Sequence, residues 1–278
     1  MQYGQVIGPI WFKKKVLNES KHFVDVSPPK NVSSNIAQNL MSSVKTLYVS
    51  SLLNDGKTVD YASLSKSSEF EEFKAQTTQL NDVKLDEMTE TERKAFFINV
   101  YNALTIHGIL SLGCGDSLFE RLQFYAKVSY SIDKFVFNLN EIENGVLREN
   151  RRSPTPFTKI PFSADDPRLK FTSKCDPRIH FALNCGAKSC PPIRFYDPEK
   201  IEQQLDLATK AFVNGLELSE NGKSLRLSKI FYWYRNDFGS NDREILEWIE
   251  PFVTAPEKKE AVKNQLKGKD VKCSYAPY

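Results

Sequence analysis

The sequence predicts an α+β fold, a small, mostly antiparallel sheet packed on a buried central helix and preceded by a helical flank. The first observation is the segment 93–112, which is apolar on nearly every side, as expected of a helix inside a core. The second is a pair of strand-like segments, 128–132 and 135–139, separated by two residues in the manner of a hairpin. Helices and strands do not alternate regularly, and this disfavours a parallel sheet.

The N-terminal region predicts a helical flank rather than part of the sheet. Residues 1–34 contain Pro28-Pro29 and several Ser and Asn, which indicates an extended lead-in. Apolar residues follow at helical spacing over 35–53, and a second helical region is predicted over 60–73. We therefore assign 1–84 to a lead-in and a helical flank that packs on the core.

The central helix has clear start and stop signals. Thr89 and Glu92 form a capping-box pattern, in which the threonine caps the helix and the glutamate reaches back to its amide. Gly113 is expected to end the helix.

Shorter elements are predicted after the hairpin. Asn140 is expected to cap a short helix over 141–148, and a Pro-rich connector follows over 150–177. The next predicted elements are a buried strand, a helix, two more strands and a helix, at 179–183, 198–215, 224–227, 230–234 and 241–252 respectively. The core then spans 85–255, and 256–278 forms a charged tail that is helical and then frays.

Composition excludes several classes of partner. The net charge is +3, from 38 basic and 35 acidic residues, so there is no basic excess of the kind that nucleic-acid binding requires. The run Lys13-Lys14-Lys15 is interpreted as a solvated surface. No stretch approaches ~18 uninterrupted apolar residues, so we expect no membrane span and no membrane partner.

Cysteine usage points to a reducing compartment. An odd, sparse set of five cysteines in a chain of 278 residues does not resemble a disulfide framework. The first residues lack the pattern of a secretory signal peptide. We therefore expect a cytoplasmic protein.

The segment 178–192 is the strongest candidate for chemistry because it brings His180 close in sequence to Cys185 and Cys190. A thiolate is a nucleophile, and an imidazole can act as its base. Two other interpretations stay open. Cys185 and His180 could be satisfied core residues, or the three side chains could belong to a zinc or redox site, although the spacing differs from the usual zinc signatures. We assign no metal ligand and no cofactor.

The central helix contributes a second group of candidates. Asn99, Asn102 and His107 are polar residues in an otherwise apolar helix, and an unpaired buried amide costs ~1–3 kcal/mol. They are predicted either to bind substrate, with the amides as oxyanion donors, or to bond neighbouring loops and fix the fold.

Three charged residues complete the set of candidates. Glu143 and Arg148 are predicted either to enter a cleft or to complement the dipole of their short helix. Asp237 is predicted to orient a histidine as the third member of a triad, or else to cap a turn.

Four of these segments, in this order, resemble the domain of unknown function 547 family. The resemblance covers roughly 85–240 and runs through 95–108, 142–148, 178–192 and 233–238. Members of that family occur alone and as C-terminal parts of larger proteins, so the resemblance is compatible with a larger multidomain parent.

The family is distantly similar to the papain-like and transglutaminase-like cysteine hydrolases, which implies a site of the Cys-His-Asp type. In those enzymes the nucleophile begins the central helix, whereas this helix has Asn99 and no cysteine near its start. The nucleophile would then be Cys185 or Cys190. Plant relatives often have serine at the Cys190 position, which favours Cys185.

The leading expectation is a hydrolase- or transferase-like domain that acts on an amide, peptide or isopeptide bond in a peptide or protein. Cys185 would attack the carbonyl, with His180 as base and then acid, and Asp237 or Glu143 would orient the imidazole. The two alternatives are a non-catalytic module that binds a protein or peptide, and a zinc- or redox-linked site.

Overall fold

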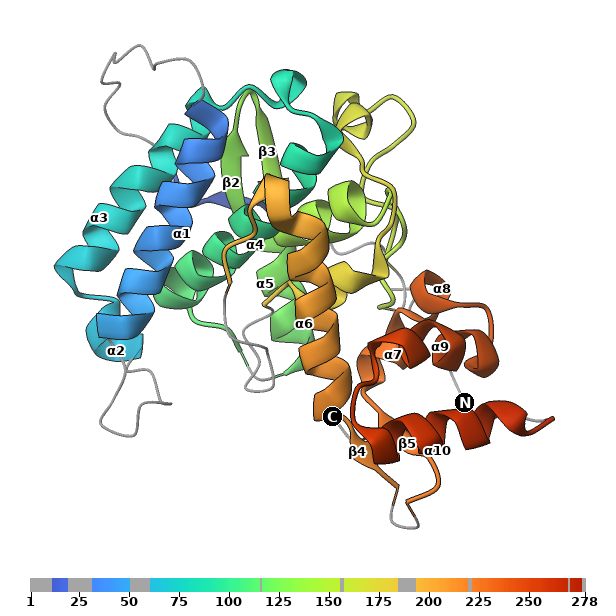
Figure 1. Cartoon of the computed structure of the whole chain (residues 1–278). Helices are drawn as coiled ribbons and strands as arrows, with labels where there is room; N and C mark the ends of the chain where they lie inside the picture. Colours follow the sequence, from blue (N-terminus) through green and yellow to red (C-terminus); the bar gives the residue numbers. More distant parts are fainter. Residues whose placement is uncertain are drawn as a thin grey trace, which may run out of the picture. The chain divides into compact units, whose positions relative to one another are not determined.

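The structure is a computed structural model and describes residues 12–19, 32–50, 61–115, 117–155, 158–184, 194–219, 222–269 and 271–276. The chain divides into two compact units (Figure 1). Unit 1 comprises Met1–Lys174 and Asn184–Pro198, and unit 2 comprises Cys175–Leu183 and Glu199–Tyr278. Both helices and strands are present, which agrees with the predicted α+β class.

Unit 1 begins with a helical flank. Helices α1 (Val32–Ser50) and α3 (Ser68–Thr77) pack on one another, and α1 also packs on the central helix α4 (Figure 1). A short helix, α2 (Tyr61–Leu64), precedes α3, and the 3₁₀ turns η1 (Thr78–Asp82) and η2 (Leu85–Glu87) follow it. The two helical regions predicted from apolar spacing are therefore both present.

The central helix α4 (Glu90–Leu112) is the core of unit 1. Both bonds of the predicted capping box form, since the Thr89 hydroxyl accepts from the Glu92 amide at 3.2 Å and Glu92 accepts from the Thr89 amide at 2.8 Å. Every residue from Ala95 to Gly108 is buried. Among the described residues α4 is the helix that is long and apolar enough to cross a membrane, but 83% of its apolar window is buried within the protein. It is therefore a core helix.

A three-stranded sheet lies beside α4, in the order β1 (Lys15–Val16), β2 (Val128–Ile132), β3 (Phe135–Asn138). Helix α5 (Leu118–Lys127) leads into β2. Strands β2 and β3 form the predicted hairpin, with Ile132 opposite Phe135, and β1 pairs with β2 in parallel. The sheet is therefore mixed, because the lead-in contributes a strand that was not predicted from its sequence.

Helical backbone after the hairpin begins at Leu139, two residues before the predicted start at Glu141. The Asn138 side chain accepts from the Glu141 amide at 2.8 Å, and the Glu141 carboxylate accepts from the Asn138 amide at 2.9 Å. Asn140 has helical dihedrals, φ −63° and ψ −38°, and makes no side-chain cap, so its predicted capping role is wrong. The cap is Asn138, where the extended backbone of β3 ends, and a π-helix, η3 (Glu141–Leu147), follows.

Unit 2 contains the elements on which two strand predictions fail. The segment 179–183 lies largely in the 3₁₀ helix η5 (Pro177–Phe181), because Pro177 has no N–H for a ladder and Asp176 accepts from the Arg178 amide at 3.1 Å. The segment 230–234 lies mainly in α7 (Lys229–Trp233), which Ser228 caps by accepting from the Ile230 amide at 3.3 Å. In both places local side-chain capping overrides strand-forming composition.

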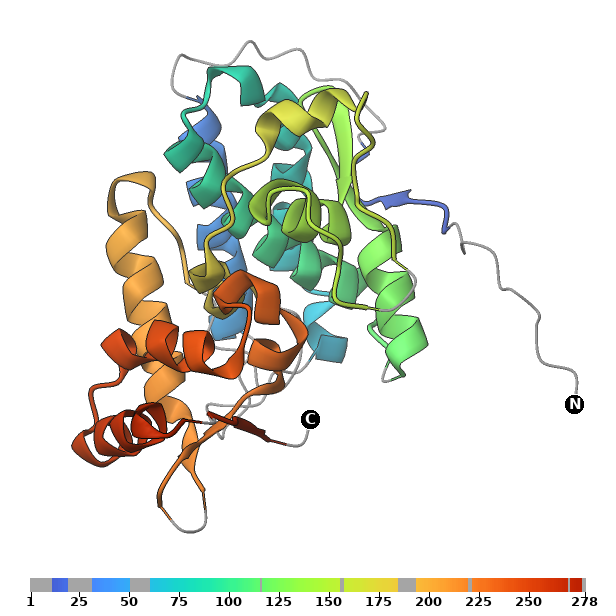
Figure 2. The ribbon, with the colours of Figure 1, turned by 90° about the vertical axis from the view of Figure 1, so that its right-hand side faces the viewer.

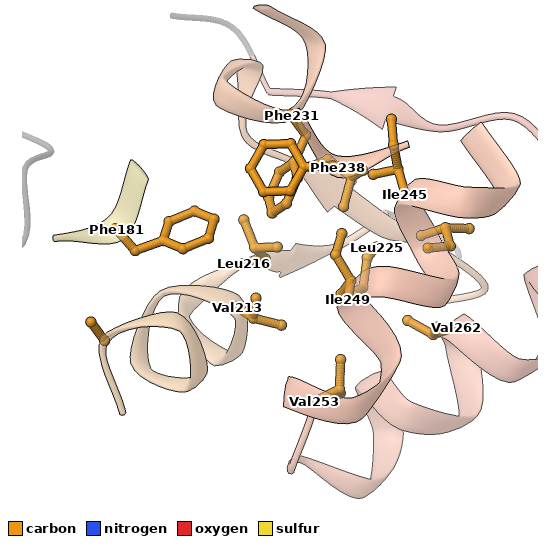
Figure 3. Close-up of a cluster of buried hydrophobic side chains, with 13 residues drawn as sticks. Phe181, Val213, Leu216, Leu225, Phe231, Phe238, Ile245, Ile249, Val253 and Val262 are labelled. Carbon is orange, nitrogen blue, oxygen red and sulfur yellow. The ribbon is translucent and has the colours of Figure 1, made fainter. Parts of the chain in front are cut away.

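The remaining elements of unit 2 surround an aromatic and aliphatic core that includes Phe181, Phe231 and Ile245 (Figure 3). Strands β4 (Glu217–Leu218) and β5 (Leu225–Leu227) are antiparallel, and β6 (Ser274–Tyr275) pairs with β5 in parallel, so Ser274 and Tyr275 form a strand where fraying was predicted. Three further 3₁₀ turns connect elements. They are η4 (Pro167–Phe171) in unit 1, η6 (Pro198–Lys200), where the chain passes from unit 1 to unit 2, and η7 (Glu250–Phe252) in unit 2. The other elements are α6 (Ile201–Gly215), β4 (Glu217–Leu218), β5 (Leu225–Leu227), α8 (Arg235–Phe238), α9 (Asp242–Ile249), α10 (Pro256–Lys267) and β6 (Ser274–Tyr275).

Replacing Gly145 in η3 is expected to destabilise unit 1. A Cβ at this position would lie 2.5 and 2.6 Å from two ring carbons of Phe162, which is fully buried. Gly145→Ala should therefore lower the free energy of unfolding by ~1–3 kcal/mol. Gly215→Ala is the matched control, because a Cβ at the end of α6 meets nothing within 4 Å. Urea unfolding measures both variants, and equal midpoints would contradict the expected clash.

Candidate active site in the smaller unit

A buried histidine–aspartate pair is the most distinctive polar feature of unit 2. His180 Nε2 lies 2.8 Å from Asp237 Oδ2, and their side chains are 3% and 0% exposed. His180 comes from η5 and Asp237 from α8, which are 57 positions apart in the sequence. The predicted pairing of these two residues is therefore present in the fold.

An ion-pair cluster holds η5, and with it His180, on helix α6. Arg178 donates bidentately to Asp176 at 2.7 and 3.0 Å within η5, and to Asp206 on α6 at 2.7 Å. Its guanidinium also bonds Glu202 on α6. These carboxylates, Asp176 first, raise the pKa of Arg178, so the clamp stays charged at all relevant pH values.

Aromatic contacts fix the plane of the imidazole. The ring centroid of Tyr234 lies 4.0 Å from that of His180, with 36° between the planes, and the Phe238 centroid lies at 5.5 Å. The Asp237 amide donates to the Tyr234 carbonyl at 2.8 Å, so the stacking ring and the carboxylate come from one tight turn. The sidechain of His180 is thus constrained by packing as well as by its hydrogen bond.

In unit 1, two asparagines on α4 bind the two ends of the segment that contains the cysteine motif. The Asn102 side-chain oxygen accepts from the Asn184 amide at 2.7 Å. Asn99 donates to the Tyr196 carbonyl at 2.8 Å and accepts from its amide at 2.9 Å. Because the two asparagines lie on neighbouring turns of one helix, they hold the loop ends close together. Of the two roles predicted for them, the loop-bonding role is the one with visible contacts.

Residues 85–213 match the family model "Protein of unknown function, DUF547". The match supports the family identification made from the four motifs, and it contains α4, η3 and His180 but ends before Asp237. No curated protein and no solved structure matches the chain.

Cys185 and Cys190, which fall within the matched residues, lie outside the residues that the structure describes. Cys273 in unit 2 is described, and burial first, then Asp242, raises the pKa of its thiol to about 12. It is therefore a poor nucleophile. Within the described ranges there is no group of three His, Cys, Asp or Glu residues that could hold a metal ion.

The charged candidates of the DUF547 region have partners in unit 1. Glu143 on η3 accepts from the Tyr101 hydroxyl at 3.2 Å. Arg148 is 4% exposed, donates to the Arg152 carbonyl at 3.2 Å and also bonds the Asn144 side chain. The carboxylate beside His180 is that of Asp237, so Glu143 is the weaker candidate for orienting it.

His107, the third polar candidate on α4, is a core residue. It is 1% exposed, its Nδ1 lies 2.9 Å from the Tyr130 hydroxyl, and the rings of Phe70 and Phe73 pack edge-on around it. This burial leaves it no surface with which to bind a substrate.

The sequence interpretation missed Tyr234 as a contributor to the site. The sequence contains a pattern that could have indicated this role, because Tyr234 and Asp237 are at i, i+3 spacing and so share one face of a helical turn. Treating 230–234 as a strand concealed this spacing. The roles of Asn184 and Tyr196 had no such signal, since only their backbone atoms take part.

Proposed function

We propose that this protein is a cysteine-dependent hydrolase or acyl transferase that acts on an amide or peptide bond, with His180 and Asp237 as its acid–base pair. The observation that carries the proposal is the 2.8 Å bond between His180 Nε2 and Asp237 Oδ2, made by side chains that are 3% and 0% exposed. A buried carboxylate on one ring nitrogen is the arrangement that orients a catalytic imidazole and stabilises its protonated form.

The pair sets the tautomer of the imidazole. An ionised carboxylate only accepts hydrogen bonds, so Nε2 carries the proton that Asp237 accepts, and Nδ1 carries the lone pair. Nδ1 has no hydrogen-bond partner in the part of the chain that the structure describes. This nitrogen is therefore the one suited to take a proton from a thiol.

Cys185 is the proposed nucleophile on the basis of sequence, being five positions after His180. Its neighbour Asn184 is held by Asn102, and the described Cys273 has a thiol pKa of about 12. Because both groups of the Asn99 amide bind Tyr196, we assign Asn99 and Asn102 the role of positioning the loop instead of binding an oxyanion.

The proposed reaction balances without a cofactor. The thiol proton passes to His180, the Cys185 sulfur bonds the carbonyl carbon, and the C–N bond breaks as the imidazolium protonates the leaving amine. Water, or a second amine in the transferase form, then attacks the thioester, and His180 accepts its proton. The C–S bond breaks, which releases the acid or the new amide, and the Cys185 thiolate takes the proton back from His180. A reducing compartment such as the cytoplasm would keep the thiol competent. The proposal is consistent with the Cys-His-Asp site implied by a distant papain-like or transglutaminase-like relationship.

Removing the carboxylate of Asp237 is expected to deactivate the thiol. Iodoacetamide labelling across pH ~5–9, read for each cysteine by mass spectrometry, should give Cys185 an apparent pKa well below ~8.5 in the native protein. Asp237→Asn should raise that pKa and slow labelling at low pH by at least ~10-fold, since the amide cannot stabilise an imidazolium. Glu247→Gln, which removes one exposed carboxylate of unit 2, is the matched control.

Other outcomes would overturn the proposal in distinguishable ways. Uniformly slow labelling of Cys185 and Cys190 in the folded wild type would favour a non-catalytic binding module. Protected thiols with one zinc ion per purified chain would favour a metal site, because a carboxylate-bound histidine is also a common zinc ligand. Identical Cys185 profiles in wild type and Asp237→Asn would remove His180 and Asp237 from thiol activation.

A further inference from the structure

The turn between α4 and α5 in unit 1 presents large apolar side chains to solvent. Leu112 is 40% exposed, Leu118 is 69% exposed and Phe119 is 52% exposed. The neighbouring residues 111, 113, 117 and 120 are also exposed, so these side chains project from the surface. Clustered exposed apolar residues on a soluble unit indicate an interaction site.

Basic side chains adjoin this apolar turn. The ring centroids of Phe12 and Phe119 lie 6.0 Å apart, which joins the segment before β1 to the start of α5. The Lys127 ammonium lies 5.3 Å from the Phe12 ring, and Lys13 and Lys15 are exposed beside it. Figure 2 shows α5, in light green, and β1, in blue, at the same edge of unit 1.

The carboxylate of Glu120, next to the apolar residues, is turned toward the helix start. It accepts from the Ser117 hydroxyl at 2.6 Å and from the Ser117 amide at 3.1 Å, and these bonds lower its pKa. Its charge is thus directed at the positive end of α5. Lys13 and Lys15 are exposed positive charges beside the apolar residues, where they could contact a partner.

We propose that this surface, formed by Phe12, Lys13, Lys15, Leu118 and Phe119, docks on an anionic lipid bilayer. Projecting leucine and phenylalanine side chains insert at the boundary between headgroups and acyl chains, and flanking lysines attract anionic headgroups. Projecting side chains suit a bilayer, because a bilayer needs no complementary shape. The sequence expectation of no membrane partner rested on the absence of a spanning segment and did not address docking at a surface.

Vesicle sedimentation of the full chain tests this inference. Wild type should bind vesicles containing about one third phosphatidylserine and should bind neutral phosphatidylcholine vesicles much less. Leu118→Ser with Phe119→Ser should weaken binding at least ~10-fold. Lys13→Glu with Lys15→Glu should weaken it at low salt and less so at high salt, since salt screens exposed charges.

Ile160→Ser with Leu207→Ser is the matched control, because these apolar residues are 52% and 57% exposed elsewhere on the chain. The control should bind like wild type. Absence of wild-type binding, as a protein-only partner would give, overturns the inference, and so does an equal loss in both double serine variants. Thiol labelling should be unchanged in Leu118→Ser with Phe119→Ser, so this test is independent of the proposed catalytic function.

Discussion

Acidification from about pH 8 to about pH 5 is expected to lower the free energy of unfolding by ~2 kcal/mol through His107 alone. Burial, with a smaller contribution from Lys74, lowers the pKa of His107 from 6.5 to about 3. Between these values the unfolded chain binds a proton that the folded chain does not. Stability is therefore greatest above about 6.5 and falls by ~1.4 kcal/mol per pH unit as the pH decreases toward 3.

The surroundings of His107 explain why the fold excludes its proton. Phe70 and Phe73 pack edge-on against the imidazole, and burial raises the pKa of Tyr130, which therefore stays a neutral hydroxyl. His107 Nδ1 lies 2.9 Å from the Tyr130 hydroxyl, and this neutral oxygen carries no negative charge with which to stabilise an imidazolium.

Urea unfolding of wild type and His107→Gln, followed by circular dichroism between about pH 8 and pH 5, isolates this contribution. The glutamine oxygen can still accept from Tyr130 but does not titrate, so the variant should lose less stability on acidification. Carboxylates with lowered pKa values change the free energy of unfolding mainly below this pH range, where they become protonated. Parallel stability profiles for the two proteins would show that His107 titrates normally in the fold.

Glu141→Gln is expected to lower the free energy of unfolding by about 3 kcal/mol, because it removes one of the two anions from a partly buried charge network. Glu141 is 7% exposed and lies 2.6 Å from Lys14 and 3.0 Å from Arg168. Arg168 also lies over the rings of Phe137 and Phe162, which keep its guanidinium from water. Without this carboxylate, Asp166 still pairs with Arg168, but Lys14 loses its ion pair, which ties the segment before β1 to η3.

Glu71→Gln is a matched control for this prediction. Glu71 lies 2.6 Å from Lys74, the same distance as in the buried pair, but its side chain is 67% exposed. Its loss should cost less than ~1 kcal/mol, since exposed ion pairs contribute little. Chemical unfolding of both variants compares a buried and an exposed ion pair of the same length. Similar losses in the free energy of unfolding would show that the network at Glu141 does not stabilise unit 1.

The members of the candidate site could be chosen from the sequence, but their pairing could not. His180 and Asp237 each stand in a recognisable motif, yet they are 57 positions apart and only the packing of α8 near η5 joins them. For the same reason Glu143 and Asp237 were equal candidates for the orienting acid. Asn99 and Asn102 were recognised as amides in need of partners, but the partners are backbone atoms of Tyr196 and Asn184, which side-chain patterns do not reveal.

The sequence by itself determined the central helix, the hairpin and the helical flank, because capping residues and apolar periodicity act over a few positions. Tertiary structure decided the strand β1, since Lys15 and Val16 are extended only through pairing with β2. It also decided that His107 is buried beside a neutral hydroxyl, whereas His180 forms a hydrogen bond with a carboxylate, although both are histidines in apolar surroundings. Local signals fix the conformation of a segment, whereas the protonation and partners of a buried polar group depend on the residues that distant segments place around it.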